Sequence, residues 1–245
     1  WCLFEVGSTP TEKLQLLTPP GMGDGEVVDA AQRVDVDAAL CFSPADREMI
    51  YAGIREKFGS NKELTERLQL RLMLRPLGYA ADMAALLRRA EGETFRFDEL
   101  RAFVRGGGGR AAVVEGAAGE GKSTISASIV AADDIVDAYH FCKRSDVRRQ
   151  DPLLVVHSLA YQLALRRPRD VRRAILELDA KRLMRARSDA DEAATALLHE
   201  PMAAIPDGEH VVLLMDAMDE GGIGGAGRNV VGEVLHKVIK RIPLK

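Results

Sequence analysis

The sequence predicts an α/β fold in which helices cover both faces of a parallel sheet. Apolar runs of strand length at 111–114, 135–142 and 211–215 alternate with segments of helical pattern. A glycine-rich turn follows the first run, and a cluster of carboxylates follows the third. Strands that alternate with helices are typical of parallel sheets, so we expect a three-layer α/β/α arrangement.

Composition fits a globular domain and excludes several classes of protein. The 245 residues are 47% hydrophobic and 29% charged, with a net charge of −3. Cys2, Cys41 and Cys142 lack metal-ligand spacing, so neither a disulfide framework nor a zinc site is expected. The longest apolar runs are too short to span a membrane, and we expect a cytoplasmic protein. Because the chain begins with Trp1, we expect it to be a piece of a longer protein.

Residues 1–90 are expected to form a smaller α/β or mostly helical region. The run 14–17 has the pattern of a strand that enters a proline-rich loop. Ser43 and Pro44 mark a helix start, as a cap and a first-turn proline. A second helix follows over leucines spaced four residues apart and is closed by Pro76.

Residues 91–110 are predicted to link this region to a nucleotide domain at 111–245. The aromatic and leucine side chains at 95, 97, 100 and 103 fit a short helix that docks on the next domain. The glycines 106–109 then give a flexible stop before the strand 111–114.

The turn after residue 114 has the Gly-x4-Gly-Lys-Ser spacing of a phosphate-binding loop. Its glycines let consecutive backbone N–H groups surround a phosphate, and the following helix adds its positive end. Lys122 would reach the β- and γ-phosphates, and the hydroxyl of Ser123 would bind Mg²⁺. The predicted nucleotide-binding residues are Gly116, Ala117, Ala118, Gly119, Glu120, Gly121, Lys122, Ser123 and Thr124.

The segment 143–187 is strongly basic, with 13 Lys or Arg against five acidic residues and a local net charge of +8. An acidic partner is one interpretation. Solvated basic helix faces are the better one, because no aromatic residues are interleaved to stack on bases. We therefore do not expect nucleic acid as a partner.

The third apolar run ends in the acidic sequence Asp216-Ala217-Met218-Asp219-Glu220. A buried strand that ends in three carboxylates needs cations to tolerate them. Asp216 is predicted to hold Mg²⁺ beside Ser123, directly or through water. Asp219 and Glu220 are the predicted catalytic residues, because they would polarise the water that attacks the γ-phosphate.

The acidic sequence 216–220 resembles the form of the Walker B motif found in NACHT domains, which are P-loop NTPases of the STAND class. The stretches 140–144, 151–152 and 158–163 resemble the segment between the two Walker motifs of that family. The resemblance covers 95–245 and implies a signal-transducing switch that binds ATP or GTP with Mg²⁺. It also implies an ADP-bound resting state and homo-oligomers on activation.

The sequence departs from the NACHT pattern in two places. It ends before the strand that carries the sensor arginine, so a partial sheet is expected. The glycine-rich run 221–227 makes the loop after Glu220 unusually flexible. Without the missing parts, nucleotide is expected to bind weakly and hydrolysis to be negligible.

The opening residues Trp1-Cys2-Leu3-Phe4-Glu5 resemble a stretch in the second half of TIR-like domains. The resemblance implies that Glu5 corresponds to the glutamate used by NAD-cleaving members. An amphipathic core segment explains the same residues equally well. Since the first half of such a domain is missing, no NAD hydrolysis is expected.

The sequence therefore predicts a switch ATPase. A P-loop kinase is the alternative enzyme, although the acidic cluster favours water over another acceptor. The alternative without catalysis is a degenerate domain that serves only as an assembly scaffold. Such a domain would bind nucleotide without hydrolysing it, or would bind none.

Overall fold

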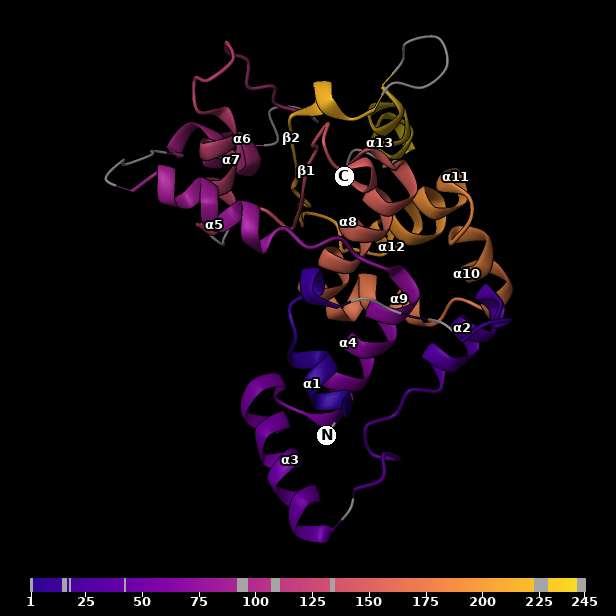
Figure 1. Ribbon diagram of the computed structural model, residues 1–245. Coiled ribbons are helices and arrows are strands. Elements are labelled where there is room, and N and C mark those ends of the chain that lie inside the picture. The colour runs from indigo at the N-terminus through magenta and orange to yellow at the C-terminus, as the bar shows by residue number, and fades with distance from the viewer. Residues whose placement is uncertain are drawn as a thin grey trace.

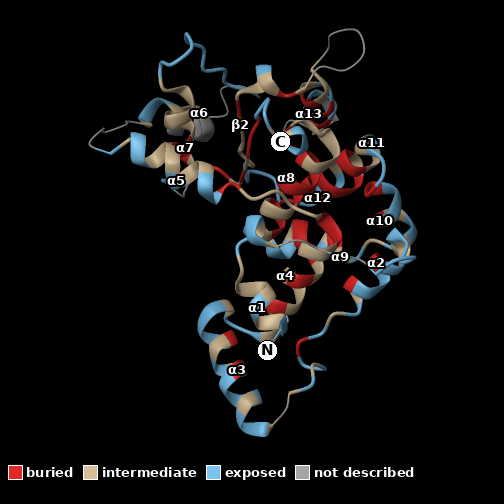
Figure 2. Ribbon diagram, in the orientation of Figure 1, coloured by how far each residue is buried: buried red, intermediate tan, exposed pale blue. Residues whose placement is uncertain are grey.

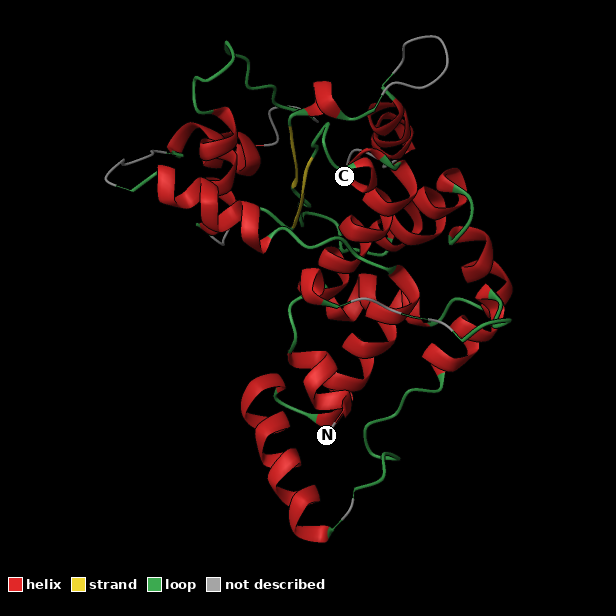
Figure 3. Ribbon diagram, in the orientation of Figure 1, coloured by secondary structure: helices red, strands yellow, loops and turns green. Residues whose placement is uncertain are grey.

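The protein is predominantly helical, with a small parallel sheet (Figures 1 and 3). The computed structural model describes residues 2–14, 17, 19–41, 43–91, 97–106, 111–132, 135–222 and 229–241. The helices are α1 (Cys2–Ser8), α2 (Asp24–Gln32), α3 (Pro44–Phe58), α4 (Asn61–Leu74), α5 (Ala80–Arg89), α6 (Asp98–Gly106), α7 (Lys122–Ala131), α8 (Pro152–Arg166), α9 (Arg173–Leu176), α10 (Ala180–Ala186), α11 (Ala190–Ala193), α12 (Glu200–Ala203) and α13 (Val230–Arg241). The strands are β1 (Ala138–Phe141) and β2 (Leu213–Asp216). Short 3₁₀ turns are η1 (Thr11–Lys13), η2 (Val147–Gln150) and η5 (Met218–Glu220), and π-helical turns are η3 (Pro168–Arg172) and η4 (Ala194–His199).

β1 and β2 pair in parallel, with Ala138 opposite Leu213 and Phe141 opposite Asp216. Their side chains alternate between the two faces of the sheet, as the period of a strand requires. One face packs on the core around α8, through Ala138, Leu213 and Met215. The other face packs on α6 and α7, through Tyr139, Val212 and Leu214. The predicted mixture of parallel strands with helices on both faces is thus present, around two strands.

The predicted strand 111–114 is not formed. Residues 111–117 have no regular secondary structure, and Val113 and Val114 are 78% and 68% exposed. A strand exists only through hydrogen bonds to a neighbour, and β2 pairs with β1 alone among the described residues. For the same reason the run 211–215 is half-buried rather than fully buried as expected.

The predicted helix starts and the docking helix lie close to their expected positions. Ser43 and Asp151 accept hydrogen bonds from the first turns of α3 and α8, each of which has proline at its start. Phe97 and Leu100 pack on α7, which confirms the docking helix, α6. The expected strand 14–17 lies partly outside the described residues, and Leu17 is 76% exposed. No strand is present in the described part of 2–91, so this region is helical.

Helices of the N-terminal region share the main hydrophobic core. Buried residues gather around α8 and α12 (Figure 2). This core also receives Val28 and Ala31 from α2 and Leu70, Met73 and Leu74 from α4. A second, smaller core joins α1, α3 and α4 (Figure 1). Helix α4 therefore belongs to both cores and connects them.

Buried polar side chains form hydrogen bonds with the backbone carbonyls at the carboxyl end of α4. Arg187 is 3% exposed and donates from Nη1 to the carbonyl oxygens of Leu72 and Met73, at 3.2 and 2.6 Å. His157 Nδ1 lies 2.6 Å from the carbonyl oxygen of Leu74. The last carbonyls of a helix lack partners within it and attract positive groups. Arg187 thus supplies hydrogen bonds to the carbonyls of Leu72 and Met73 and adds a favourable positive charge at this end of the helix.

Arg172 makes a second buried connection between the two halves of the chain. Its guanidinium is 2% exposed and lies 2.5 Å from Glu63 Oε2 and 3.1 Å from Glu66 Oε2 on α4. The basic segment 143–187 was expected to be solvated. Arg149, Arg172 and Arg187 are instead buried and paired with acidic side chains. A buried arginine needs such partners because an unpaired charge is costly in the interior.

None of the helices in the described part of the chain is long and apolar enough to cross a membrane.

His140 lies fully buried in β1 between two hydrogen-bond partners. Its Nδ1 lies 2.6 Å from the Tyr79 hydroxyl, and its Nε2 lies 2.9 Å from the carbonyl oxygen of Arg149. Burial lowers the pKa of His140 to about 4. The neutral ring fits both contacts, because Nε2–H donates to the carbonyl while Nδ1 accepts from the hydroxyl.

This burial predicts a loss of stability in mild acid. The unfolded chain binds a proton near pH 6.5 that folded His140 does not accept, so stability falls as the pH drops below that value. Between pH 7 and pH 5, wild type should lose about 2 kcal/mol more unfolding free energy than His140→Gln. Urea unfolding at both pH values measures the difference, with exposed His210→Gln as the control. Equal pH dependence in wild type and His140→Gln would contradict the prediction.

Candidate functional site

The predicted phosphate loop is an exposed turn that leads into α7. Residues Gly116 to Glu120 are exposed, whereas Gly121 and the first turn of α7 are half-buried. Gly119 and Gly121 have φ values of 85° and 84°, a region that side chains other than glycine rarely adopt. The backbone conformation of the loop therefore favours glycine at these two positions.

The two charged side chains within the loop bond to its own backbone. Lys122 donates from Nζ to the carbonyl oxygens of Gly116 and Ala117, at 2.6 and 2.7 Å. Glu120 Oε2 accepts from the N–H of Ala117 at 2.6 Å. A Cβ atom on Gly116 would lie 2.5 Å from the same carboxylate oxygen, so a larger residue there would displace the Glu120 side chain from this contact. Glu120 thus places an anion against a loop amide.

Helix α7 begins at Lys122 without a side-chain cap. Ser123 and Thr124 lie in its first turn. By contrast, α3, α4, α8 and α10 each begin with a serine or aspartate that accepts from the helix. The first N–H groups of a helix need acceptors and form a positive end. The start of α7 is therefore suited to an anion.

Asp216 ends β2 and faces α7. It is 7% exposed, and its Oδ1 accepts from Ser126 Oγ at 3.0 Å. Ser126 lies one turn beyond Ser123 on the same helix. Within the described residues, no basic side chain forms an ion pair with Asp216. A nearly buried carboxylate beside a hydroxyl oxygen is the kind of donor that Mg²⁺ prefers, so the chemistry of this pair is compatible with a divalent cation.

The chain turns sharply after Asp216. Ala217 has φ 53° and ψ 44°, a left-handed conformation that is unusual outside glycine and asparagine. The turn continues as η5, which carries Asp219 and Glu220. Asn229 bonds this turn to α13: it donates from Nδ2 to the Met218 carbonyl, and its Oδ1 accepts from Gly232 N–H at 2.8 Å. The two predicted catalytic carboxylates thus sit on a constrained turn.

Cys142, the residue after β1, is buried and experiences the negative charge of the three carboxylates. Burial raises the pKa of Cys142 to about 12, and the negative charges of Asp216, Glu220 and Asp219 add to the effect. The Cys142 N–H donates to the Asp216 carbonyl at 3.0 Å, which extends the pairing of β1 with β2. Glu220 Oε2 accepts from the N–H of Arg144 at 2.6 Å. Glu220 is therefore held by the loop that follows β1.

The structure joins the two predicted motifs through α7 and β2. Ser126, rather than Ser123, makes the hydrogen bond to Asp216. The sequence pattern did not single out Ser126, although its position three residues after Ser123 places both on one side of the helix. Within the described residues, no group of three or more His, Cys, Asp or Glu could hold a metal by itself. The magnesium assignments of Ser123 and Asp216 stay predictions.

Comparison with known families gives one match. The family described as Nephrocystin 3, N-terminal matches residues 94–243, which include both the phosphate loop and the acidic turn. The chain belongs to the nephrocystin 3 N-terminal family. The match is not to a NACHT family model, so the NACHT resemblance rests on the motif residues. No curated protein and no solved structure matches the chain.

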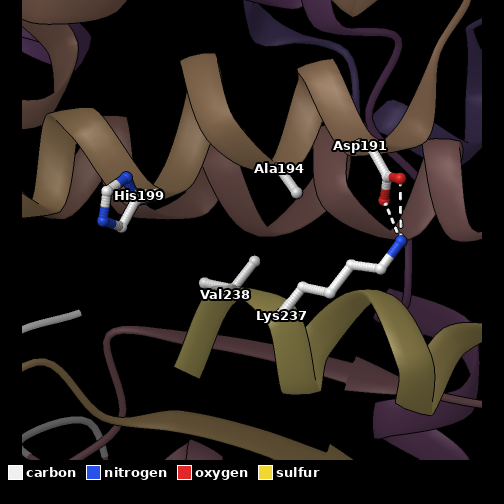
Figure 4. Close-up of a pocket in the computed structure, with 5 residues that line it drawn as sticks. All are labelled: Asp191, Ala194, His199, Lys237 and Val238. Atoms are coloured by element: carbon white, nitrogen blue, oxygen red, sulfur yellow. Dashed lines mark hydrogen bonds and ion pairs between the residues drawn. The ribbon is translucent and has the colours of Figure 1, made fainter. Parts of the chain in front are cut away.

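A small pocket lies between η4 and α13, within the range matched by the nephrocystin 3 N-terminal family. Figure 4 shows its lining residues, Asp191, Ala194, His199, Lys237 and Val238. The cavity measures about 10 Å³, roughly the space of one water molecule. Lys237 donates to both oxygens of Asp191 at 2.7 Å. The pocket is part of the packing of α13 and has no room for a nucleotide.

The contact of Glu120 with Ala117 predicts how the loop responds to substitution. A bound phosphate would compete with this carboxylate for the loop amide and would be repelled by its charge. Glu120→Ala should therefore raise the affinity for ATP by about fivefold, the equivalent of one hydrogen bond. Titration calorimetry measures the change. Exposed Glu115→Ala removes the same charge next to the loop and is the control, so equal gains in both variants would contradict a specific role for Glu120.

Proposed function

We propose that this protein is a nucleotide-dependent signalling switch that binds ATP or GTP with Mg²⁺ and hydrolyses it slowly. The observation that carries the proposal is the hydrogen bond from Ser126 to Asp216. It connects the helix after the glycine loop to the acidic end of β2, across 90 residues of sequence. A phosphate-binding helix beside an acidic strand end is the arrangement that phosphate transfer from a nucleotide requires.

Each predicted residue then has a role that its position supports. Lys122 would release the carbonyls of the loop and neutralise the β- and γ-phosphates. Ser123 and Asp216 would hold the metal ion. When bound, Mg²⁺ supplies positive charge that stabilises the negative charge developing on the phosphates. Glu220, already oriented by one N–H group, would accept a proton from the attacking water, with Asp219 beside it.

Hydrolysis would serve switching rather than metabolism. Contacts to a γ-phosphate can order or release a surface, and their loss on hydrolysis reverses the change. By the NACHT resemblance, an ADP-bound resting state, homo-oligomers on activation and a cytoplasmic location complete the proposal. The glycine-rich run 221–227, which was expected to make the loop after Glu220 flexible, lies largely outside the described residues.

An assembly scaffold without turnover is the second candidate. The exposed segment 111–117 favours it, because a loop that follows no paired strand would bind phosphate weakly. A phosphate-release assay with ATP and Mg²⁺ separates the two. A kinase has no specific observation in its favour, and a screen for phosphorylated small molecules tests it.

Replacing Lys122 tests the nucleotide site. Lys122→Ala removes the only lysine of the loop, so ATP binding should fall below detection by titration calorimetry, a loss of at least about 100-fold. Lys181→Ala removes an exposed lysine on α10 and should leave the affinity unchanged. Unchanged affinity in Lys122→Ala would remove the loop from the site.

Replacing Glu220 tests the proposed chemistry. Glu220→Gln keeps the shape and the acceptor for Arg144 N–H but cannot take a proton, so turnover should fall by about 100-fold while nucleotide affinity is retained. Steady-state phosphate release and calorimetry give the two quantities. Glu177→Gln, on an exposed pair with Arg173, is the control. A rate equal to wild type would exclude Glu220 as the base.

A further inference from the structure

Residues 77–89, which we name the α5 clamp, contact both halves of the candidate site. They precede residue 94, where the family match begins. The clamp starts at Leu77, whose N–H donates to Ser158 Oγ on α8 at 2.8 Å. It continues through Tyr79 into α5, which lies beside α7 on one side of the sheet (Figure 1). A segment outside the matched range therefore reaches the site.

The apolar side of the clamp packs on the phosphate-loop helix. Met83, Leu86 and Leu87 of α5 join a cluster with Ala127 of α7 and Phe141 of β1. Ala127 is fully buried there. Since α7 follows the glycine loop directly, the packing of α5 on α7 helps to hold the loop in place.

The polar side of the clamp holds the residues after β1. Tyr79 is 4% exposed and bonds to His140, and the guanidinium of Arg149 lies 5.1 Å from the centre of its ring. Asp82 forms ion pairs with Arg149 and with Lys143, the latter at 3.1 Å. Partial burial opposes the charge of Asp82, but the hydrogen bonds from Arg149 and Lys143 outweigh it and lower its pKa.

These contacts fix the loop 143–150, which holds Glu220. Gln150 closes the loop by donating from Nε2 to the carbonyl oxygens of Arg144 and Lys143, at 2.7 and 3.3 Å. Asp82 bonds to side chains at both ends of this closed loop. The N–H of Arg144 then meets Glu220 Oε2 at 2.6 Å. One carboxylate oxygen is thus committed to the loop, and the other can accept from water.

We propose that Asp82 is a positioning residue for Glu220: its ion pairs to Lys143 and Arg149 fix the loop whose Arg144 N–H orients the Glu220 carboxylate. The inference rests on the proposed function, because it assumes that Glu220 orients the attacking water. It adds that turnover depends on the helical region before the family-matched range. Orientation of a base affects the reaction step and leaves nucleotide contacts unchanged.

A double-mutant cycle in the full chain tests the proposal. Asp82→Asn keeps the shape of the side chain and removes its charge, so kcat for phosphate release should fall about tenfold with nucleotide Kd within about twofold of wild type. In the Glu220→Gln background the same change should have no further effect, because the group it positions is already gone. Lys143→Ala breaks one of the two ion pairs and leaves that with Arg149, so its loss of kcat should have the same direction as that of Asp82→Asn and be no larger.

Asp191→Asn is the matched control, since it removes a carboxylate that pairs with Lys237 away from the site (Figure 4). Its rate should equal that of wild type. A rate loss from Asp82→Asn that persists undiminished in Glu220→Gln, or a weakened Kd that accounts for the loss, would overturn the positioning role.

Amide hydrogen exchange separates failure of this inference from failure of the proposed function. Absence of turnover in wild type would refute the ATPase proposal alone. Without nucleotide, the Arg144 amide should still exchange at least about tenfold faster in Asp82→Asn than in wild type or Asp191→Asn. Unchanged exchange at Arg144 would refute the clamp, whatever the turnover.

Discussion

The parallel pairing of β1 with β2 determines where every candidate catalytic side chain lies. It sets Phe141 opposite Asp216, so both strands end at the same level. From that level one chain continues into the loop 143–150 and the other into the turn with Asp219 and Glu220. A slip of one residue would turn Asp216 to the opposite face of the sheet, away from Ser126. Helix layers on both faces oppose such a slip, because it would bring apolar side chains out of both cores.

The N-terminal helices are joined to this sheet by buried charge as well as by apolar packing. Arg187 and Arg172 connect α4 to segments more than 100 residues later in the chain. Removing Arg187 would leave two carbonyls at the end of α4 without this donor, and removing Arg172 would leave Glu63 and Glu66 with only Arg67 and Lys62 as partners among the described residues. Losing one partner of a buried pair costs more than the pair contributes in net stability. Such contacts favour this arrangement of the helices, since any other docking of α4 would have to find new partners for the same groups.

The sequence predicted local features such as helix caps and turn glycines correctly. It did not predict which distant segments would pair or pack together. Ser43, Asp151 and the glycines of the loop carry their own backbone requirements, so their roles follow from neighbouring residues. The segment 111–114 has the composition of a strand, but a strand depends on a partner that composition does not identify. Likewise, nothing near Arg172 or His140 in sequence indicates that α4 or Tyr79 would cover them. The link from Ser126 to Asp216 needed the relative placement of α7 and β2.

Ala217 illustrates how a motif position can be set by geometry rather than by chemistry. Its left-handed backbone excludes branched side chains at this point, whatever the ligand. Related chains should therefore accept Gly, Asn or Ala here and reject Val, Ile or Thr. A comparison of sequences would register that restriction as functional conservation. A damaging substitution at Ala217 would then report on the folding of the turn and would carry no information about what the carboxylates on either side of it bind.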